Sequence, residues 1–499
     1  MLALSFPRYG QPVLALVALA PLFVALSGWR GRPGVCPGVS TGRGFLLGLL
    51  TGLVHFAGTV YWIGETVRTF GGLGRPVAVL VAGLLVLYMA TFVALAGAAS
   101  ALVIRRYGAR GFVLAPFAWV ATEYLRGHLF GGFPWIPLGN AVVTLLPIAQ
   151  LASVVGVYGV SLYLASINAA FAFVLVATAR DRLKAAAVAT ALVAAGSIWG
   201  GARLSASVLT TAGTPVRIGV VQGNVPQEEK WDRSRAGAIL SRYLSMTREV
   251  AKEGVDVVMW PESATPFYFD EDPAGAAAVR ALSRELATPI LFGTDEVERR
   301  SPDRYFNSAF VLDRAGATAA VYRKIHLVPF GEYVPFQQAL FFVAPLVDAV
   351  SNFSAGTRVT LLPIAGHMAS TAICYEVVYP HLIREGVLNG SELLTTITND
   401  AWYGRSSAPF QHFELAAMRA IEQGRYLARA ANTGISGFVD PYGRVLSRTR
   451  LFETTTLVGE VRFLQQLTLY ARIGDLTAQI AVLVTLLSIA GALWSARPS

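Results

Sequence analysis

Three short motifs in the second half of the chain carry side chains that could perform acyl-transfer chemistry. Glu262 closes a Trp-Pro-Glu motif, Lys324 closes a Tyr-Arg-Lys motif, and Cys374 opens a Cys-Tyr-Glu motif. Acylation of a thiol requires a base that removes the thiol proton, and a cation or amide donors that stabilise the tetrahedral oxyanion. We therefore predict that Glu262 is a general base, that Lys324 stabilises an oxyanion and that Cys374 is the nucleophile.

Each of these residues has a simpler explanation when it is considered alone. A glutamate can stand in a turn, a lysine can be a solvated charge, and a cysteine can be a small buried hydrophobic residue. The combination favours catalysis, because a carboxylate, an amine and a thiol each follow a predicted strand. A carboxylate that takes a thiol proton needs a raised pKa, and burial near Glu332 and Glu376 is expected to raise the pKa of Glu262.

Short β-branched runs alternate with helical patterns between about residues 215 and 460, which predicts an α/β domain. The predicted strands are Val216–Val221, Val255–Trp260, Pro289–Gly293, Ser308–Leu312, Ala319–Tyr322, Ser370–Cys374 and Leu393–Thr398. The predicted helices include Arg233–Lys252, Ala274–Leu286 and Gln411–Ala431. Open α/β sheets place their functional sites at strand ends, so the three motifs are expected to meet there.

Long apolar runs outside this domain predict a membrane protein, because about 20 mostly apolar residues are needed to cross a hydrocarbon core. The runs are Pro12–Gly28, Gly44–Ile63, Val77–Ile104, Gly111–Leu125, Val154–Thr178, Ala185–Gly200 and Leu476–Trp494. We therefore predict an N-terminal transmembrane domain over residues 1–201, a catalytic domain over residues 215–460 and a C-terminal transmembrane helix over residues 475–495.

The composition argues against an ordinary soluble protein and against nucleic-acid binding. Only 14% of the residues are charged, against roughly 25% in soluble domains, and 54% are hydrophobic. The net charge is +10, but the first 200 residues hold 13 of the 41 basic residues and 3 of the 31 acidic residues. The remaining 299 residues hold 28 of each sign, so the excess lies beside the apolar runs. Basic residues in that position orient a membrane protein and do not form a phosphate-binding surface.

The loops between the apolar runs alternate in charge, with nine basic residues on one side and three on the other. By the positive-inside rule, the side with nine is cytoplasmic, and the catalytic domain faces the periplasm of a bacterial inner membrane. Cys36 and Cys374 then lie on opposite sides, which excludes a disulfide framework. This alternation leaves Met1–Arg8 outside, unless Leu2–Phe6 is the stub of an additional first helix.

The three motifs resemble those of the nitrilase superfamily, whose members carry Glu, Lys and Cys in this order on an αββα sandwich. Further loop motifs resemble the apolipoprotein N-acyltransferase family, a membrane-bound branch of that superfamily. These loop motifs are Val221–Gln227, Lys230–Asp232, His326–Glu332, Thr398–Gly404, Gln411–His412 and Ala431–Ser436. The resemblance covers nearly the whole chain. It implies a multi-span α-helical membrane domain joined to an α/β nitrilase-like αββα sandwich domain.

The resemblance also implies a reaction. The family transfers an acyl chain from a membrane phospholipid to the α-amino group of the N-terminal diacylglyceryl-cysteine of an apolipoprotein. Cys374 would form a thioester acyl-enzyme with ping-pong kinetics, Glu262 would be the general base, and Lys324 would stabilise the oxyanion. Glu332 would hold Lys324 in place, and Glu376 would support the nucleophile region.

Other residues are expected to assist this reaction. The backbone amide of Tyr375 would complete the oxyanion hole. Trp231, Trp402 and Tyr403 could line the path of an acyl chain or head group, as the resemblance implies, or could pack in the core. The apolar segment Ala339–Val347 could be a substrate-facing lid or ordinary core.

We expect no metal and no cofactor. The six histidines show no paired metal-ligand spacing, so His326 and His412 are expected to be hydrogen-bonding loop residues. His55, inside an apolar run, is expected to be a satisfied or interface-facing histidine. A site formed by one chain needs no partner subunit, so a monomer is expected.

Two other functions stay open on the sequence alone. A membrane-tethered amidase of the nitrilase type would use the same three residues but would let water resolve the thioester. A transporter or scaffold would use the domain only to bind ligands and would not depend on Cys374. The membrane flanks and the loop motifs favour acyl transfer, because donor and acceptor are both anchored in the bilayer by acyl chains.

Overall fold

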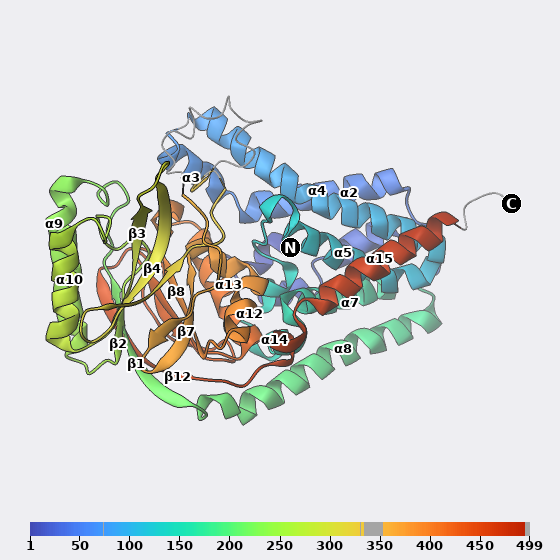
Figure 1. Ribbon diagram of the computed structural model, residues 1–499. Helices are drawn as coiled ribbons and strands as arrows, with labels where there is room; N and C mark the ends of the chain where they lie inside the picture. Colours follow the sequence, from blue (N-terminus) through green and yellow to red (C-terminus); the bar gives the residue numbers. More distant parts are fainter. Residues whose placement is uncertain (73, 330, 334–352, 495–499) are drawn as a thin grey trace.

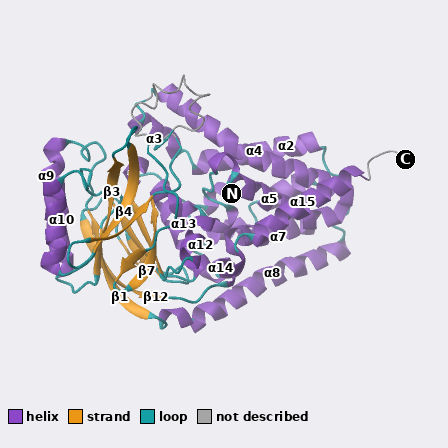
Figure 2. Cartoon of the chain, in the orientation of Figure 1, coloured by secondary structure: helices purple, strands orange, loops and turns teal. Residues whose placement is uncertain are grey.

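The computed structural model describes residues 1–72, 74–329, 331–333 and 353–494. The strands gather at one end of the molecule, and a bundle of long helices forms the other end (Figures 1 and 2). The bundle contains both the N-terminal helices and the last helix. The strand-rich part is therefore inserted, in sequence, between two parts of the same bundle.

Two six-stranded sheets make up the strand-rich part. The first has the order β12-β1-β2-β3-β4-β5, with β1, β2 and β3 parallel and the remaining pairs antiparallel. Its strands are β1 (Thr214–Gln222), β2 (Val257–Met259), β3 (Ile290–Glu298), β4 (Arg304–Leu312), β5 (Thr318–Arg323) and β12 (Thr455–Phe463). The second has the order β11-β10-β9-β8-β7-β6, with β7, β8 and β9 parallel. Its strands are β6 (Leu362–Ile364), β7 (His367–Ile373), β8 (Leu393–Thr398), β9 (Leu427–Ala431), β10 (Gly437–Val439) and β11 (Val445–Arg448).

Alternate residues of the first sheet belong to two different cores. Val216, Ile218 and Val220 of β1 join the core shared with the second sheet. Val221 of β1 and Val258 of β2 join a separate core beneath the outer helices. Both faces of the sheet are therefore covered, which explains why these strands are continuous apolar runs in the sequence.

Helices cover the outer face of each sheet, which completes an αββα sandwich. The covering helices are α9 (Arg233–Ala251), α10 (Pro273–Leu286), α12 (Pro380–Leu388) and α13 (Ala408–Gln423). The first two lie against the first sheet, and the last two lie between the second sheet and the helical bundle (Figure 1). The predicted fold class, a helical membrane-type part joined to a nitrilase-like sandwich, is confirmed.

All seven predicted strands are present, some with different ends, but one predicted helix is partly wrong. The helix expected over Gln411–Ala431 ends at Gln423, and the strand β9 occupies its last five positions. Gly424 ends the helix because its φ of +61° lies in the left-handed region, where glycine carries no steric penalty. The strand β9 reads Leu-Ala-Arg-Ala-Ala, a run of strong helix formers, so tertiary packing overrides the local propensity here.

Four helical segments of the described residues are long and apolar enough to cross a membrane, or five if one bent pair counts as a single span. The four are Arg75–Arg126, Ala152–Val176, Ala179–Thr210 and Leu476–Trp494. The bent pair is α2 (Thr41–Thr59) and α3 (Trp62–Phe70), with an angle of 54° between its helices. Arg75–Arg126 contains α4 (Arg75–Tyr107) and α5 (Gly111–Arg126), which pack against each other.

The first predicted apolar run is not one continuous helix. Residues Pro12–Leu16 form a 3-10 turn, and α1 covers only Ala20–Leu26. The other runs lie within α2 and α3, α4, α5, α7 (Ala152–Val176), α8 (Ala179–Ala206) and α15 (Leu476–Trp494).

One buried glutamine makes several of the contacts between the sandwich and the bundle. The side-chain oxygen of Gln411, on α13, accepts hydrogen bonds from the indole nitrogens of Trp135 at 2.8 Å and Trp62 at 3.3 Å. Its amide nitrogen donates to the carbonyl oxygens of Pro7 and Thr59, each at 2.9 Å. Gln411 is buried, so these bonds fix α13 to four separate segments of the helical part.

A close backbone approach shapes the turn that follows β2. A Cβ atom on Gly293 of β3 would lie 2.6 Å from Glu262 Cα and 2.7 Å from Ser263 N. The Gly293 carbonyl oxygen also accepts a hydrogen bond of 2.7 Å from Ala264 N. Only a residue without a side chain lets this turn reach its position.

We predict that Gly293→Ala lowers the free energy of unfolding by about 1–3 kcal/mol, the usual cost of overpacking. The added methyl group meets backbone, which cannot rotate away. Thermal unfolding of the purified protein in detergent measures this change. Gly237→Ala is the matched control, because a Cβ on this α9 residue meets nothing within 4 Å and should stabilise the helix. Equal effects of the two substitutions would contradict the prediction.

Candidate active site

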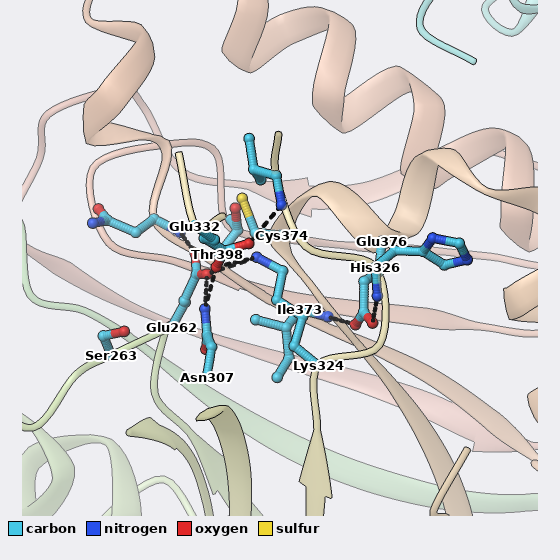
Figure 3. Close-up of polar contacts among 12 residues, drawn as sticks. Glu262, Ser263, Asn307, Lys324, His326, Glu332, Ile373, Cys374, Glu376 and Thr398 are labelled. Carbon is cyan, nitrogen blue, oxygen red and sulfur yellow. Dashed lines mark hydrogen bonds and ion pairs between the residues drawn. The ribbon is translucent and has the colours of Figure 1, made fainter. Parts of the chain in front are cut away.

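A buried lysine connects two carboxylates beyond the strand ends of the first sheet. Lys324 Nζ lies 2.8 Å from Glu332 Oε1 and 3.4 Å from Glu262 Oε1. Asn307 donates through Nδ2 to both carboxylates, at 2.7 Å to Glu262 and 3.0 Å to Glu332. Lys324 is 1% exposed and Glu262 is 6% exposed. Figure 3 shows this cluster, with the sulfur of Cys374 beside it.

The strand directions bring these side chains together. Glu262 follows β2 and Lys324 follows β5, and the pairing of the intervening strands gives β2 and β5 the same direction. Both residues therefore lie at the same end of the first sheet, beyond the carboxyl ends of β2 and β5. Cys374 follows β7 of the second sheet and begins the 3-10 turn η8 (Cys374–Val378). The structure thus brings Glu262, Lys324 and Cys374 together from both sheets.

The surroundings of Glu262 favour its charged form. Burial alone raises the pKa of this carboxyl group. The Lys324 ammonium, the Asn307 amide and the Lys230 ammonium together lower it by more, so the pKa of Glu262 lies below its ordinary value. The prediction that neighbouring acids raise the pKa of Glu262 is therefore wrong. Burial and the Glu262 charge raise the pKa of the Cys374 thiol. At rest, the site holds a neutral thiol beside a carboxylate.

Lys324 stays charged although it is buried. Burial by itself lowers the pKa of this amine, but the charges of Glu332 and Glu262 raise it to a value above that of an exposed lysine. The other oxygen of Glu332 accepts a hydrogen bond of 2.7 Å from Val328 N, which fixes the carboxylate in the loop that follows Lys324. The ammonium therefore offers a permanent, positioned positive charge.

Glu376 connects the Cys374 turn to the Lys324 strand end. Its Oε2 accepts from Ile373 N at 2.8 Å. Its Oε1 accepts from the Tyr322 hydroxyl at 2.8 Å, from Ile325 N at 2.6 Å and from His326 N at 3.1 Å. Figure 3 shows Glu376 beside His326 and Ile373. Burial raises the pKa of Glu376 to about 7, and these hydrogen bonds oppose that rise. Three of these four bonds come from backbone N–H groups, on the Cys374 side and on the Lys324 side of the site, so Glu376 fixes the two segments relative to each other.

Sequence reasoning missed several groups that contact Glu262. Lys230 is buried, and its Nζ donates to the Glu262 carbonyl oxygen at 2.9 Å. Burial lowers the pKa of Lys230 to about 8. Asn399 N donates to Glu262 Oε2 at 2.7 Å, in addition to the Asn307 contact. Lys230 and Asn399 both lie in the loop motifs quoted above, but a motif does not show which of its residues faces the carboxylate.

The three aromatic candidates lie in different surroundings. Trp231 is 43% exposed and packs against Tyr268, with ring centroids 5.8 Å apart. Trp402 is 38% exposed and contacts Phe70 of α3 edge to face. Tyr403 is half-buried, and its ring lies among the rings of Trp62, Trp135 and His412. Tyr403 is therefore mainly a packing residue, whereas the rings of Trp231 and Trp402 are partly exposed.

Tyr375, next to the nucleophile, packs against a loop of the helical part. Its ring stacks on Phe133 and Trp135 at centroid distances of 6.0 and 6.3 Å. Its hydroxyl donates to Gly132 O at 3.5 Å. The site is thus built partly from the membrane-type part. The candidate lid Ala339–Val347 lies outside the described residues.

Cys374, Asp400 and His412 form the one group among the described residues that combines metal-binding side chains at close range, with ligand atoms within 4.8 Å of one another. The Asp400 carboxylate and the His412 ring already bond to each other at 2.9 Å. Arg429 Nη2 also lies 3.1 Å from each of them. A guanidinium in this position repels a cation, so the residues do not fit a metal site.

Comparison with known proteins gives the family. Residues 217–468 match the carbon-nitrogen hydrolase family, and residues 1–170 match the N-terminal domain of apolipoprotein N-acyltransferases. An apolipoprotein N-acyltransferase of Geobacter metallireducens is 38% identical over 97% of this chain and 91% of its own. One of Methylococcus capsulatus is 35% identical over 95% of this chain and 91% of its own. The solved structure of an amidase from Nesterenkonia sp. is 20% identical and covers 55% of this chain and 98% of its own, with a TM-score of 0.41. On the full-length relatives and both matched domains, the chain belongs to the apolipoprotein N-acyltransferase family of the carbon-nitrogen hydrolase superfamily.

Proposed function

We propose that this chain transfers an acyl chain from a membrane phospholipid to the α-amino group of the diacylglyceryl-cysteine of an apolipoprotein. The observation that carries the proposal is the buried cluster of Glu262, Lys324 and Cys374, which stands beside helices long enough to span a bilayer. The names of the relatives supply the substrate class. No metal or cofactor is needed for this chemistry.

The first half-reaction forms a thioester. Glu262 takes the proton of the Cys374 thiol while Sγ attacks the ester carbonyl carbon of the phospholipid. The negative charge that develops on the carbonyl oxygen faces the Lys324 ammonium and the N–H of Tyr375. The carbon–oxygen bond then breaks, protonated Glu262 returns the proton to the leaving alkoxide, and a lysophospholipid departs.

The second half-reaction uses the same groups in reverse. The acceptor amine, in its neutral form, attacks the thioester carbon while Glu262 takes a proton from the nitrogen. The carbon–sulfur bond breaks, and the proton passes to Sγ, which regenerates the thiol and leaves an amide. Glu332 keeps Lys324 directed at the oxyanion throughout, and Glu376 holds the turn that carries Cys374.

The geometry also suits the two lipid substrates. Trp231 and Trp402 are exposed near the site and are proposed to contact the acyl chain or head group. Residues 1–201 and the last helix are proposed to hold the chain in a bacterial inner membrane, with residues 215–460 on the periplasmic side. Exposed apolar side chains support contact with lipid on the outer helices, namely Leu183, Ile198, Leu486, Leu487 and Leu493. A monomer is proposed, because one chain supplies all these groups.

We expect a covalent acyl-enzyme when the purified protein is incubated with phospholipid alone. Mass spectrometry should find one acyl mass on the peptide that contains Cys374, and hydroxylamine should remove it because the linkage is a thioester. Cys374→Ala should abolish the adduct and all transfer, and Glu262→Gln should abolish the adduct. Cys36→Ala is the matched control and should leave both unchanged.

Addition of a diacylglyceryl peptide to the isolated acyl-enzyme separates acyl transfer from hydrolysis. The proposal requires the acyl chain to appear on the peptide amine. Release of free fatty acid with an unmodified peptide would instead identify a hydrolase. Full transfer activity in Cys374→Ala would refute the covalent mechanism.

The proposed orientation predicts that Cys36 and an engineered cysteine in the segment after β12 lie on opposite sides of the membrane, which labelling of spheroplasts can test. Cys374 is only 4% exposed, so it is expected to react slowly with a maleimide. The probe for the outer side is therefore an engineered cysteine at the exposed residue Gln465, made in a Cys36→Ala background. A membrane-impermeant maleimide should label Gln465→Cys in intact spheroplasts and should label Cys36 only after lysis. Labelling of Cys36 before lysis would reverse the orientation.

A further inference from the structure

A histidine on α13 holds the carbonyl group of the nucleophile. His412 Nε2 lies 3.0 Å from the Cys374 carbonyl oxygen, and both residues are buried. A carbonyl oxygen can only accept a hydrogen bond, so Nε2 carries the proton and donates. Cys374 has a φ of +52°, in the left-handed region that a non-glycine residue adopts at a cost of about 1–3 kcal/mol. His412 therefore secures a strained turn at the reacting residue.

This bond has a consequence for the neighbouring amide. The carbonyl of Cys374 and the N–H of Tyr375 belong to one planar trans peptide group, in which they point in opposite directions. Tyr375 is the second residue of η8, where backbone N–H groups have no carbonyl partner within the turn. The hydrogen bond from His412 holds the carbonyl side of this peptide group. The Tyr375 N–H, on the other side of the same plane, is therefore directed away from His412.

Two further buried residues fix the imidazole ring. His412 Nδ1 lies 2.9 Å from Asp400 Oδ1 and 3.1 Å from Arg429 Nη2. The same Arg429 nitrogen donates to Asp400 Oδ2 at 3.1 Å, and Thr398 donates to Asp400 Oδ1 at 2.9 Å. The ring edge is therefore held whether Nδ1 donates to the carboxylate or accepts from the guanidinium.

The fold makes room for this arrangement. A Cβ atom on Gly434 would lie 2.1 Å from Asp400 Oδ2, so the glycine of the Asn-Thr-Gly segment leaves space for the carboxylate. Arg429 also donates through Nε to Ile435 O at 3.2 Å. Burial alone would raise the pKa of Asp400, but Arg429 and His412 lower it to about 2, so the carboxylate stays charged.

We propose that His412, backed by Asp400 and Arg429, is a positioning residue that orients the Tyr375 N–H as an oxyanion-hole donor. This inference rests on the proposed function, because it assigns a task in that same acyl transfer. Ligand atoms of His412, Asp400 and Cys374 lie within 4.8 Å of one another, so these side chains adjoin the nucleophile as well as its peptide group. The bond from His412 to the Cys374 carbonyl serves the step that forms a tetrahedral oxyanion, whereas the Asp400 charge also raises the pKa of the Cys374 thiol.

Two reactions of Cys374 separate this role from a general structural one. Acylation by phospholipid passes through an oxyanion, whereas alkylation by iodoacetamide is a displacement at carbon without one. In His412→Asn the amide can still reach Asp400 but no longer reaches the Cys374 carbonyl. Its acylation rate should fall on the order of 100-fold, the usual cost of one oxyanion donor, while its alkylation rate stays within about threefold of wild type. The loss should lie in kcat, with KM for phospholipid unchanged.

His412→Gln provides the rescue, because its longer amide can donate to the Cys374 carbonyl and should restore most of the acylation rate. His367→Asn is the matched control. His367 pairs with Glu392 at 2.8 Å at the opposite end of β7, so this variant should keep both rates. If His412→Asn fails to fold, as judged by thermal unfolding, the isosteric Asp400→Asn serves instead. Its acylation rate should fall, while its alkylation rate should stay the same or rise, because loss of the Asp400 charge lowers the pKa of the Cys374 thiol.

Equal losses of acylation and alkylation, or no loss of acylation, would overturn the inference. Failure of the proposed function looks different, because wild-type protein would then show no acyl mass on Cys374 while alkylation proceeded normally.

Discussion

The rest of the site depends on the charge of Lys324. Two buried charged side chains, Lys324 and Glu262, lie here beside the partly buried Glu332, and a buried charge would be strongly unfavourable alone. The ammonium compensates both Glu262 and Glu332, and Asn307 bridges the two carboxylates from the other side. The same charge that makes burial tolerable also keeps Glu262 deprotonated beside a neutral thiol. A base of low pKa is compatible with catalysis if the proton moves only as the carbon–sulfur bond forms, with the developing oxyanion held by the ammonium.

The helical part contributes to the site as well as to its location. Tyr375 stacks on Phe133 and Trp135, and Gln411 bonds to both Trp135 and Trp62. The residue after the nucleophile is thus packed against a loop that belongs to the membrane-type helices. This arrangement fits a reaction whose two proposed substrates reach the enzyme through a bilayer, because the nucleophile turn lies in direct contact with the membrane-type part.

Much of this organisation could be predicted from the sequence. The α/β class followed from apolar strand runs that alternate with helical patterns, and the αββα arrangement followed from the resemblance of the three motifs to the nitrilase superfamily. The meeting of Glu262, Lys324 and Cys374 followed from their positions at the ends of predicted strands. The direction of the Glu262 pKa shift was not predicted, because besides Lys324 two side chains from distant segments, Asn307 and Lys230, lower it and nothing in the sequence shows that they face this carboxylate. The strand β9 was missed because its helix-forming residues gain more from sheet pairing than from their own propensity, and the link between His412 and Cys374 depends on how α13 packs.

The most direct test of the central role of Lys324 is a double-mutant cycle on the rate of Cys374 acylation. The rate is measured for wild type, Lys324→Met, Glu332→Gln and the variant with both substitutions. If the charges act as one unit, Glu332 matters only through Lys324, and the double variant loses no more activity than Lys324→Met alone. Losses that multiply across the cycle would show that the two residues act independently and would contradict the account.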